Sequence, residues 1–222
     1  MVIPCLNEAD TIGQVVAEVR HFLPTVLVVD DGSSDQTAAR SGAAGAEVIR
    51  HESPQGKGAA LVRGWTRARE LKFAWALCLD GDGQHAPSDI PRFISAAEHT
   101  GAPLIVGNRM RQGAAMPWLR RHVNHWMSRR LSALTGCALL DSQCGFRLLR
   151  LDVWSQLVLE TRHFEIESEL LVAFAGAGLP IEFVPVQVIY RRERSKIQPC
   201  RDTVRWFCWW HRTRLRRLCK PT

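Results

Sequence analysis

Short apolar runs alternate with amphipathic segments over the first 110 residues of the chain. The apolar runs cover residues 2–3, 26–29, 47–49, 73–79 and 103–106, and a helical period is present over residues 10–22, 35–44, 57–71 and 88–99. Short apolar runs are typical of buried strands, and a period of about 3.6 residues is typical of helices. Strands that alternate with helices indicate a mainly parallel sheet with helices on both faces. The pattern therefore predicts an α/β, Rossmann-like fold, in which ligands bind beyond the carboxyl ends of the strands.

The second half of the chain alternates less regularly. Apolar residues recur at a helical period over residues 116–134, and four arginines flank that stripe. Residues 153–160 and 165–177 also have a helical pattern. The β-branched alternation of residues 181–190 predicts a strand. We find no internal repeat and no low-complexity segment.

Positive charge is concentrated at the C-terminal end. The 222 residues carry a formal net charge of +7, but residues 191–222 alone carry +9, which leaves −2 on the rest. The tryptophan-rich stretch 206–210 lies in this basic segment, and exposed aromatic side chains beside cations suit the interface of an anionic membrane. We expect one domain over residues 1–200 and a basic, amphipathic tail over residues 201–222. Nucleic acid is the competing partner, which we disfavour because no nucleic-acid-binding motif is present.

Cysteine usage and hydropathy indicate where the protein works. Seven cysteines occur without a C-x-x-C or a Cys/His finger spacing, mostly in apolar contexts, which favours reduced thiols in the cytosol. No stretch reaches the ~18 apolar residues of a membrane-spanning helix, and the first residues do not resemble a signal peptide. We therefore expect a cytoplasmic protein whose contact with a membrane is peripheral.

Two carboxylates and an amide follow a strongly apolar predicted strand. Asp80, Asp82 and Gln84 come directly after residues 73–79, and in an extended chain alternate side chains point the same way. Oxygen ligands of this kind suit Mg²⁺ or Mn²⁺ carrying a diphosphate. Asp-Gly-Asp-Gly is also good turn chemistry, and on its own the segment is more often a turn than a metal site.

Further polar loops follow the first two predicted strands. Asn7 and Glu8 lie in the first loop, and Asp30 and Asp31 open the second. Their simplest role is to cap the helices that follow. Because the carboxyl ends of parallel strands meet at one edge of the sheet, these side chains should also lie near Asp80. Carboxylates there can accept hydrogen bonds from a nucleobase or from ribose hydroxyls.

A glycine-rich turn with one lysine opens the predicted helix 57–71. Lys57 stands between Gly56 and Gly58, where it is placed for a phosphate or for the acidic cluster around Asp80. The turn is not a P-loop, because the G-x-x-x-x-G-K-S/T spacing is absent.

Seven short motifs stand in order along the chain. They are Pro4-Cys-Leu-Asn-Glu8, Val29-Asp-Asp-Gly-Ser33 with Asp35 and Thr37, Gly56-Lys-Gly58, Asp80-Gly-Asp-Gly-Gln84, Gly107-Asn-Arg109, Asp141-Ser-Gln-Cys-Gly-Phe-Arg147 and Arg194-Ser-Lys196. With these motifs the chain resembles family 2 glycosyltransferases, in particular the polyprenyl-phosphate (dolichol-phosphate) mannose and glucose synthases. The resemblance covers most of the chain.

The resemblance implies a glycosyltransferase A-type fold and a donor sugar linked to UDP or GDP. The nucleotide sugar would contact Pro4, Asn7, Glu8, Asp30, Asp31, Lys57 and Asp80, and Asp80, Asp82 and Gln84 would bind Mg²⁺ or Mn²⁺. Acceptor and phosphate groups would contact Arg109, Arg147, Ser195 and Lys196, and the catalytic set would be Asp82, Arg109 and Asp141. The segment 116–134 resembles an amphipathic helix that rests on a membrane surface.

The expected chemistry is displacement at the anomeric carbon, with the metal neutralising charge on the departing nucleoside diphosphate. A single displacement inverts the configuration of the sugar. A lipid phosphate acceptor needs no general base, whereas a hydroxyl acceptor does, and Asp141 and Glu165 are then the candidates. The resemblance and the basic tail favour a polyprenyl-phosphate acceptor at the cytoplasmic membrane face. The alternatives are transfer to a non-phosphate lipid or polysaccharide, and a nucleotide-sugar-binding module without turnover.

Overall fold

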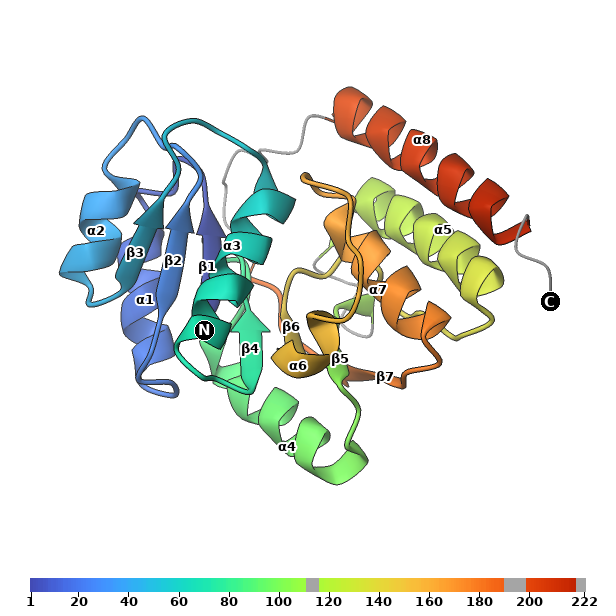
Figure 1. The fold of residues 1–222 in the computed structure, drawn as a ribbon. Coiled ribbons are helices and arrows are strands. Elements are labelled where there is room, and N and C mark those ends of the chain that lie inside the picture. Colours follow the sequence, from blue (N-terminus) through green and yellow to red (C-terminus); the bar gives the residue numbers. More distant parts are fainter. Residues whose placement is uncertain (111–115, 190–198, 219–222) are drawn as a thin grey trace.

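The computed structural model describes residues 1–110, 116–189 and 199–218, with the side chains of the last segment described for residues 201–216. Its elements are β1 (Val2–Cys5), α1 (Ile12–Arg20), β2 (Leu27–Asp30), α2 (Thr37–Ala43), β3 (Glu47–Arg50), α3 (Lys57–Glu70), β4 (Trp75–Cys78), a 3₁₀ turn (Pro87–Asp89), α4 (Ile90–Thr100), β5 (Leu104–Asn108), α5 (Trp118–Thr135), β6 (Arg147–Arg150), α6 (Leu151–Trp154), α7 (Ile166–Gly176), β7 (Ile181–Pro185) and α8 (Pro199–Leu218). Figure 1 shows one twisted sheet with α3 in front of it and α1 behind it.

The sheet has seven strands in the order β3-β2-β1-β4-β6-β5-β7. Strands β1 to β4 pair in parallel, and β7 is parallel to β5. Strand β6 runs antiparallel between β4 and β5. The predicted α/β fold with a mainly parallel sheet is therefore confirmed. Strand β6 was not predicted, because it has only four residues, begins at the last residue of a polar motif and has an arginine at each end.

Three predicted elements are shorter than their patterns suggested. Strand β4 starts at Trp75 rather than at residue 73, because Phe73 and Ala74 are exposed and lie outside the sheet. The predicted helix over residues 153–160 is wrong beyond Trp154, where α6 ends in turns. Strand β7 stops at Pro185, a residue that has no N–H to continue the pairing.

The core lies between the sheet and the helices that cover it. Every residue of β1, β2 and β5 is buried, which is typical of strands covered on both faces. Helix α3 packs closely on β1, since a Cβ at Gly64 would collide with Val2. On the same helix, the Trp65 ring meets Trp154 edge-on at 5.2 Å and donates a hydrogen bond to Cys78 Sγ.

Helix α8 lies alongside α5 and is joined to the core (Figure 1). Trp206 and Trp209 are 3% and 6% exposed, and Trp206 Nε1 donates a hydrogen bond of 2.9 Å to Ser168 Oγ. The expectation that the tryptophans of this segment are exposed is therefore wrong for these two. Within the described residues, no helix combines the length and the apolar character that spanning a bilayer requires.

Candidate active site

The loops after β1 and β2 are bound to each other at the carboxyl edge of the sheet. Asn7, which adopts a left-handed backbone with φ of 52°, donates its N–H to Ser33 Oγ at 2.8 Å. Its side-chain oxygen accepts the N–H of Ser34 at 2.8 Å. Glu8 donates its N–H to Thr37 Oγ1 at 2.8 Å. The two loops therefore form one rigid wall, and Pro4 is buried within β1 below it.

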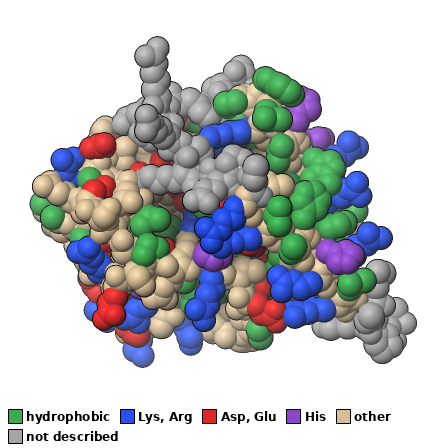
Figure 2. Space-filling view, turned by 90° about the horizontal axis from the view of Figure 1, so that it is seen from above, with side chains coloured by type: hydrophobic (Ala, Val, Ile, Leu, Met, Phe, Trp, Pro, Cys, Tyr) green, Lys and Arg blue, Asp and Glu red, His purple; other side chains and the backbone are tan. Residues whose placement is uncertain are grey.

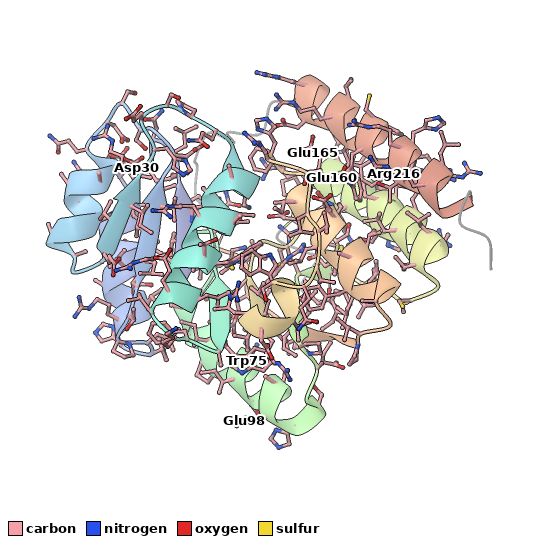
Figure 3. All side chains as sticks on the ribbon, in the orientation of Figure 1. Asp30, Trp75, Glu98, Glu160, Glu165 and Arg216 are labelled. Carbon is pink, nitrogen blue, oxygen red and sulfur yellow. The ribbon has the colours of Figure 1, made fainter. Side chains whose placement is uncertain are left out.

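Asp30 is fully buried at the end of β2, and only half of its carboxylate is satisfied. Its Oδ1 accepts the N–H of Ser33 at 2.9 Å. Its Oδ2 makes no hydrogen bond to the described protein, and Arg50 Nε lies 3.4 Å from it. An oxygen of this kind is ready to accept a hydrogen bond from a ligand. Figure 3 shows both Asp30 and Glu165, the residue before α7, in the upper part of the molecule.

Asp31 contacts the protein's own backbone. Its carboxylate accepts the N–H groups of Gln55 and Gly56 at 2.9 and 2.8 Å, and His51 Nδ1 lies 2.7 Å from it. The side chain is 5% exposed. In this conformation Asp31 fixes the turn that leads into α3 and so positions Lys57.

The loop after β4 carries the three predicted metal ligands, Asp80, Asp82 and Gln84, at this edge. Thr11 Oγ1 donates a hydrogen bond of 2.7 Å to the carbonyl of Gly81, and a Cβ at Gly81 would lie 2.6 Å from Cys5 Sγ, so the loop packs tightly on β1. Asp82 Oδ1 accepts the N–H of Gln84 at 3.0 Å. Burial and the adjacent Asp80 carboxylate raise the pKa of Asp82 to about 7.

Lys57 joins Asp80 to a residue that the sequence did not single out. Its Nζ lies 2.6 Å from Asp80 Oδ1 and 2.6 Å from Glu167 Oε1. Burial alone would raise the pKa of Asp80, but the Lys57 ammonium holds it below its usual value. Glu167 lies 110 positions from Lys57, in the first turn of a helix of apolar character. No local pattern could have paired the two residues.

The donor set at this edge fits a hard divalent cation. Asp80 and Asp82 offer carboxylate oxygens and Gln84 offers an amide. Burial and repulsion from Asp80 raise the pKa of Asp82, and a cation beside both carboxylates would relieve that repulsion. Among the described residues, no group of three or more His, Cys, Asp or Glu side chains surrounds one point. The protein would thus supply few ligands, as is usual for Mg²⁺ sites that also use phosphate oxygens and water.

Arg109 and Asp141 form an ion pair beside the cluster. Asp141 is fully buried and also accepts a hydrogen bond of 2.7 Å from Asn124 Nδ2. Burial alone would raise the pKa of Asp141, but Arg109 and Asn124 hold it below its usual value. A buried carboxylate that is committed to a guanidinium is a poor proton acceptor. In this conformation Asp141 holds the backbone and the guanidinium of Arg109 in place.

Arg147 does not reach the site in this conformation. It is 3% exposed, and its guanidinium donates to the backbone carbonyls of Ser142, Cys144 and Glu167. In this conformation these donors hold the motif together, and the expected contact between Arg147 and a phosphate stays a prediction. Ser195 and Lys196, the other expected phosphate ligands, lie outside the described residues.

Two more side chains near the site have unsatisfied polar atoms. Glu165 is 8% exposed, and its Oε2 has no hydrogen-bond partner in the described part of the protein. His85 was not singled out in the sequence; it is 4% exposed, and its Nδ1 also has no partner there. Burial lowers the pKa of His85 to about 4, so the ring is neutral near neutral pH. Glu165 remains available to a ligand.

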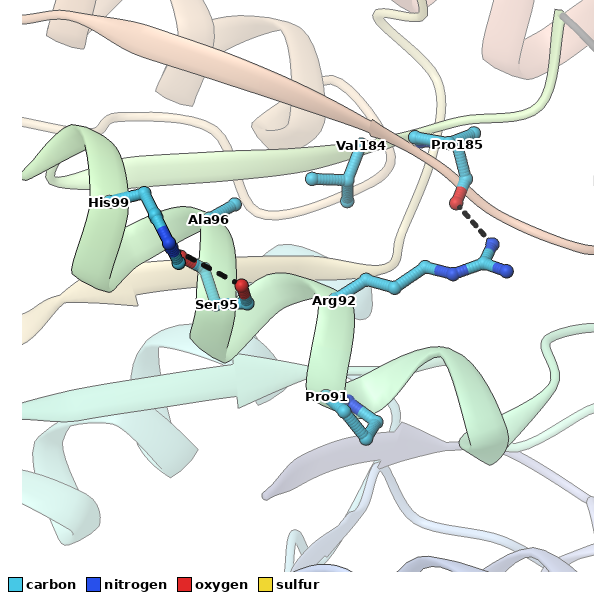
Figure 4. A pocket seen from close by; sticks show the side chains of 7 residues that line it. All are labelled: Pro91, Arg92, Ser95, Ala96, His99, Val184 and Pro185. Carbon is cyan, nitrogen blue, oxygen red and sulfur yellow. Dashed lines mark hydrogen bonds between the residues drawn. The ribbon is translucent and has the colours of Figure 1, made fainter.

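A surface depression between α4 and β7 contains none of the predicted site residues. It is lined by Pro91, Arg92, Ser95, Ala96, His99, Val184 and Pro185. Figure 4 shows Arg92 reaching across it to the carbonyl of Pro185, a hydrogen bond of 3.0 Å. His99 Nδ1 lies 2.7 Å from the carbonyl of Ser95 and 3.3 Å from its hydroxyl, so the three polar side chains of the depression are engaged within the protein.

Comparison with known proteins gives the class to which this fold and site belong. The solved structure of glucosyl-3-phosphoglycerate synthase from Mycobacterium tuberculosis with Mn²⁺, uridine diphosphate and phosphoglyceric acid matches with a TM-score of 0.74 at 24% identity, covering 100% of this chain and 78% of that chain. The fold is thus that of the A-type glycosyltransferases, as expected from the motifs.

The sequence comparisons give the family. The family model for glycosyl transferase family 2 matches residues 1–157. A UDP-N-acetylglucosamine–dolichyl-phosphate N-acetylglucosaminyltransferase of Methanococcus voltae is 30% identical over 214 residues, which cover 86% of this chain and 85% of the relative. A polyprenol monophosphomannose synthase of Mycolicibacterium smegmatis is 28% identical over 200 residues, which cover 84% of this chain and 75% of the relative. The chain belongs to glycosyl transferase family 2 and is a glycosyltransferase that uses a nucleotide sugar.

Proposed function

We propose that this enzyme transfers a sugar from a UDP- or GDP-linked donor to a polyprenyl-phosphate lipid, with inversion, at the cytoplasmic face of a membrane. The observation that carries the proposal is the cluster of Asp80, Asp82 and Lys57 at the carboxyl end of β4, the edge where nucleotides bind in open α/β sheets. Relatives whose names specify dolichyl phosphate and polyprenol as acceptors support the acceptor class.

Each part of the edge has a role in this proposal. Asp80, Asp82 and Gln84 would hold Mg²⁺ or Mn²⁺, which supplies positive charge to the diphosphate leaving group. The free oxygen of Asp30 accepts a hydrogen bond from the nucleoside, next to the wall formed by Asn7 and Glu8. These residues bind the donor and orient the anomeric carbon toward the acceptor.

The pairing of Asp141 with Arg109 supports a phosphate acceptor. A hydroxyl acceptor must lose a proton in the transition state and therefore needs a free carboxylate. Asp141 is committed to Arg109, so Glu165 is the one of the two expected bases that is still available. A phosphate monoester is already ionised near neutral pH, and Arg109, whose side chain is 18% exposed, would offer it the N–H groups that Asp141 does not use.

An apolar surface on α5 and α8 supports a membrane-bound acceptor. Trp118, Leu119 and Val123 of α5 are 72%, 58% and 44% exposed, and Val204 and Phe207 of α8 are 61% and 42% exposed. The two helices meet through the rings of Trp126 and Phe207, 5.3 Å apart. Figure 2 shows hydrophobic side chains gathered over this region, with Lys, Arg and His side chains at its margin. Such a surface suits an anionic lipid interface.

A donor and acceptor panel tests the proposal. The purified chain is incubated with UDP- and GDP-linked sugars, Mn²⁺ or Mg²⁺, and each of four acceptor conditions: polyprenyl phosphate, polyprenol, 3-phosphoglycerate and none. We expect nucleoside diphosphate release and a labelled lipid with polyprenyl phosphate alone. Transfer to polyprenol or to phosphoglycerate instead would contradict the acceptor, and donor binding by calorimetry without any release would contradict an active enzyme.

A further inference from the structure

The Lys57 ammonium lies at the same distance from two carboxylates, those of Asp80 and Glu167. Its Nζ is 2.6 Å from an oxygen of Asp80 and 2.6 Å from an oxygen of Glu167, and the ring of Phe164 lies 5.6 Å away. The side chains of Lys57 and Glu167 are 13% and 7% exposed. Asp80 borders the proposed metal position, whereas Glu167 lies behind the lysine on α7.

The charges at this point do not balance within the protein. The Lys57 ammonium contacts the carboxyl groups of Asp80 and Glu167, and Asp82 lies beside Asp80, so three carboxyl groups share one ammonium. Unbalanced carboxylates in a buried site repel each other, so the cluster favours one divalent cation. A divalent cation and an ammonium on the same carboxylate also repel each other strongly at this range. The lysine and the metal therefore compete for Asp80.

We propose that Lys57 neutralises Asp80 in the metal-free protein, and that Glu167 retains the ammonium when a divalent cation takes its place on Asp80. The inference rests on the proposed metal-dependent function. Because Lys57 already contacts Glu167, the exchange requires the loss of one contact and leaves no buried ammonium without a partner. Glu167 is then a positioning residue, and Lys57 stands beside the cation where a diphosphate binds.

The framework around both carboxylates is suited to such an exchange. Arg147, through its buried guanidinium, binds the carbonyls of Glu167 and Cys144 and so ties the start of α7 to the segment around Gly145. Gly145 in turn packs directly against the Asp80 carboxylate, where a Cβ would collide with it. Asp80 and Glu167 are thus fixed relative to each other, and the flexible lysine is the part that can move.

Titration with Mn²⁺, followed by the electron paramagnetic resonance signal of the free ion, tests the exchange on the full chain. We expect Lys57→Met to tighten Mn²⁺ binding, because the competitor is removed. We expect Glu167→Gln to weaken binding by about tenfold, because Lys57 then stays on Asp80. In the Lys57→Met background, Glu167→Gln should have a much smaller effect. Glu160→Gln, which removes the same charge from an exposed ion pair with Arg216, is the control and should change nothing.

If Glu167→Gln weakens Mn²⁺ binding equally with and without Lys57, Glu167 acts through its charge alone and the exchange is overturned. Weaker Mn²⁺ binding by Lys57→Met than by the unsubstituted chain would also overturn it. Circular dichroism spectra and melting curves of each variant show that the fold is kept. A crystal structure with Mn²⁺ should show Lys57 Nζ beyond about 4 Å from Asp80 and still bound to Glu167. If the unsubstituted chain binds no Mn²⁺, with or without UDP, the proposed function itself fails.

Discussion

Arg109 and Asp141 are joined by two parallel hydrogen bonds, from Nε to Oδ2 at 2.8 Å and from Nη2 to Oδ1 at 2.9 Å. The backbone N–H of Arg109 donates to the same carboxylate at 3.0 Å. Bidentate pairs of this kind fix the plane of the guanidinium as well as its position. The pair connects the end of β5 with the motif that begins at Asp141, and it holds Arg109 toward the edge where Asp80 lies.

We expect Asp141→Asn to lower the free energy of unfolding by about 3 kcal/mol near neutral pH, because Arg109 then lacks its buried counter-charge. The native pKa of Asp141 lies below the usual value of 3.8, so its contribution is full above that pH and is lost as the pH falls through the native pKa. Urea unfolding should therefore show a smaller difference between the two proteins near pH 3. The exposed Asp152, replaced by Asn, is the control; an equal loss there would contradict a special role for the buried pair.

Asp82→Asn should abolish sugar transfer and leave the fold intact. The carboxylate is only partly buried, and the N–H of Gln84 can be accepted equally well by the amide oxygen. Because repulsion from Asp80 disappears, we expect the melting temperature to stay the same or rise. Product formation and thermal melting are the two measurements. Loss of cooperative melting would show that Asp82 is structural.

The sequence was sufficient to predict the edge of the sheet and most of what lies on it. Motifs after β1, β2 and β4 are local in sequence, and the carboxyl ends of parallel strands bring them together without further information. The contacts of Asn7 with Ser33 and of Lys57 with Asp80 follow from that rule. Strand β6 was missed because a four-residue strand with an arginine at each end has neither a long apolar run nor a clear alternation.

The roles of individual side chains were harder to predict than their places. Asp31 and Arg147 look like ligand-binding residues in the sequence, yet both satisfy backbone groups of the protein itself. Glu167 was missed because its partner is distant in the chain and because nothing in an apolar helix marks one glutamate as paired. Hydrogen bonding to the backbone depends on loop geometry, which periodicity and motif spacing do not determine.

Gly145→Ala should weaken Mn²⁺ binding and transfer by about tenfold or more, because the new Cβ would displace the carboxylate of Asp80. The atoms in the way belong to a side chain, so the cost to stability should stay within about 1–3 kcal/mol. Gly13→Ala is the matched control, since a Cβ at that site meets its nearest neighbour at 3.9 Å. Unchanged Mn²⁺ affinity in Gly145→Ala would show that Asp80 is not a ligand.

Trp206→Ala should destabilise the whole protein by about 3–5 kcal/mol, because a large buried ring and its hydrogen bond to Ser168 are lost together. A small effect is expected for Trp118→Ala, in which the ring removed is 72% exposed. Urea unfolding followed by circular dichroism measures both. If Trp206→Ala instead leaves the main transition unchanged, α8 unfolds independently of the domain.

The apolar surface of α5 gives the last prediction. Trp118→Glu combined with Val123→Glu should reduce sedimentation of the protein with anionic liposomes, because two exposed apolar side chains on one helix become charged. Phe73→Glu is the control, since that ring is 43% exposed just before β4 and away from both helices. Because neither α5 position touches Asp80 or Arg109, transfer to a short, water-soluble polyprenyl phosphate should be unchanged. High salt should weaken liposome binding of the unsubstituted protein, since the exposed arginines of α5 and α8 act through a screened attraction. Equal liposome binding by the double variant and the unsubstituted chain would place the membrane contact elsewhere, and loss of activity on the short acceptor would place this surface in the acceptor site.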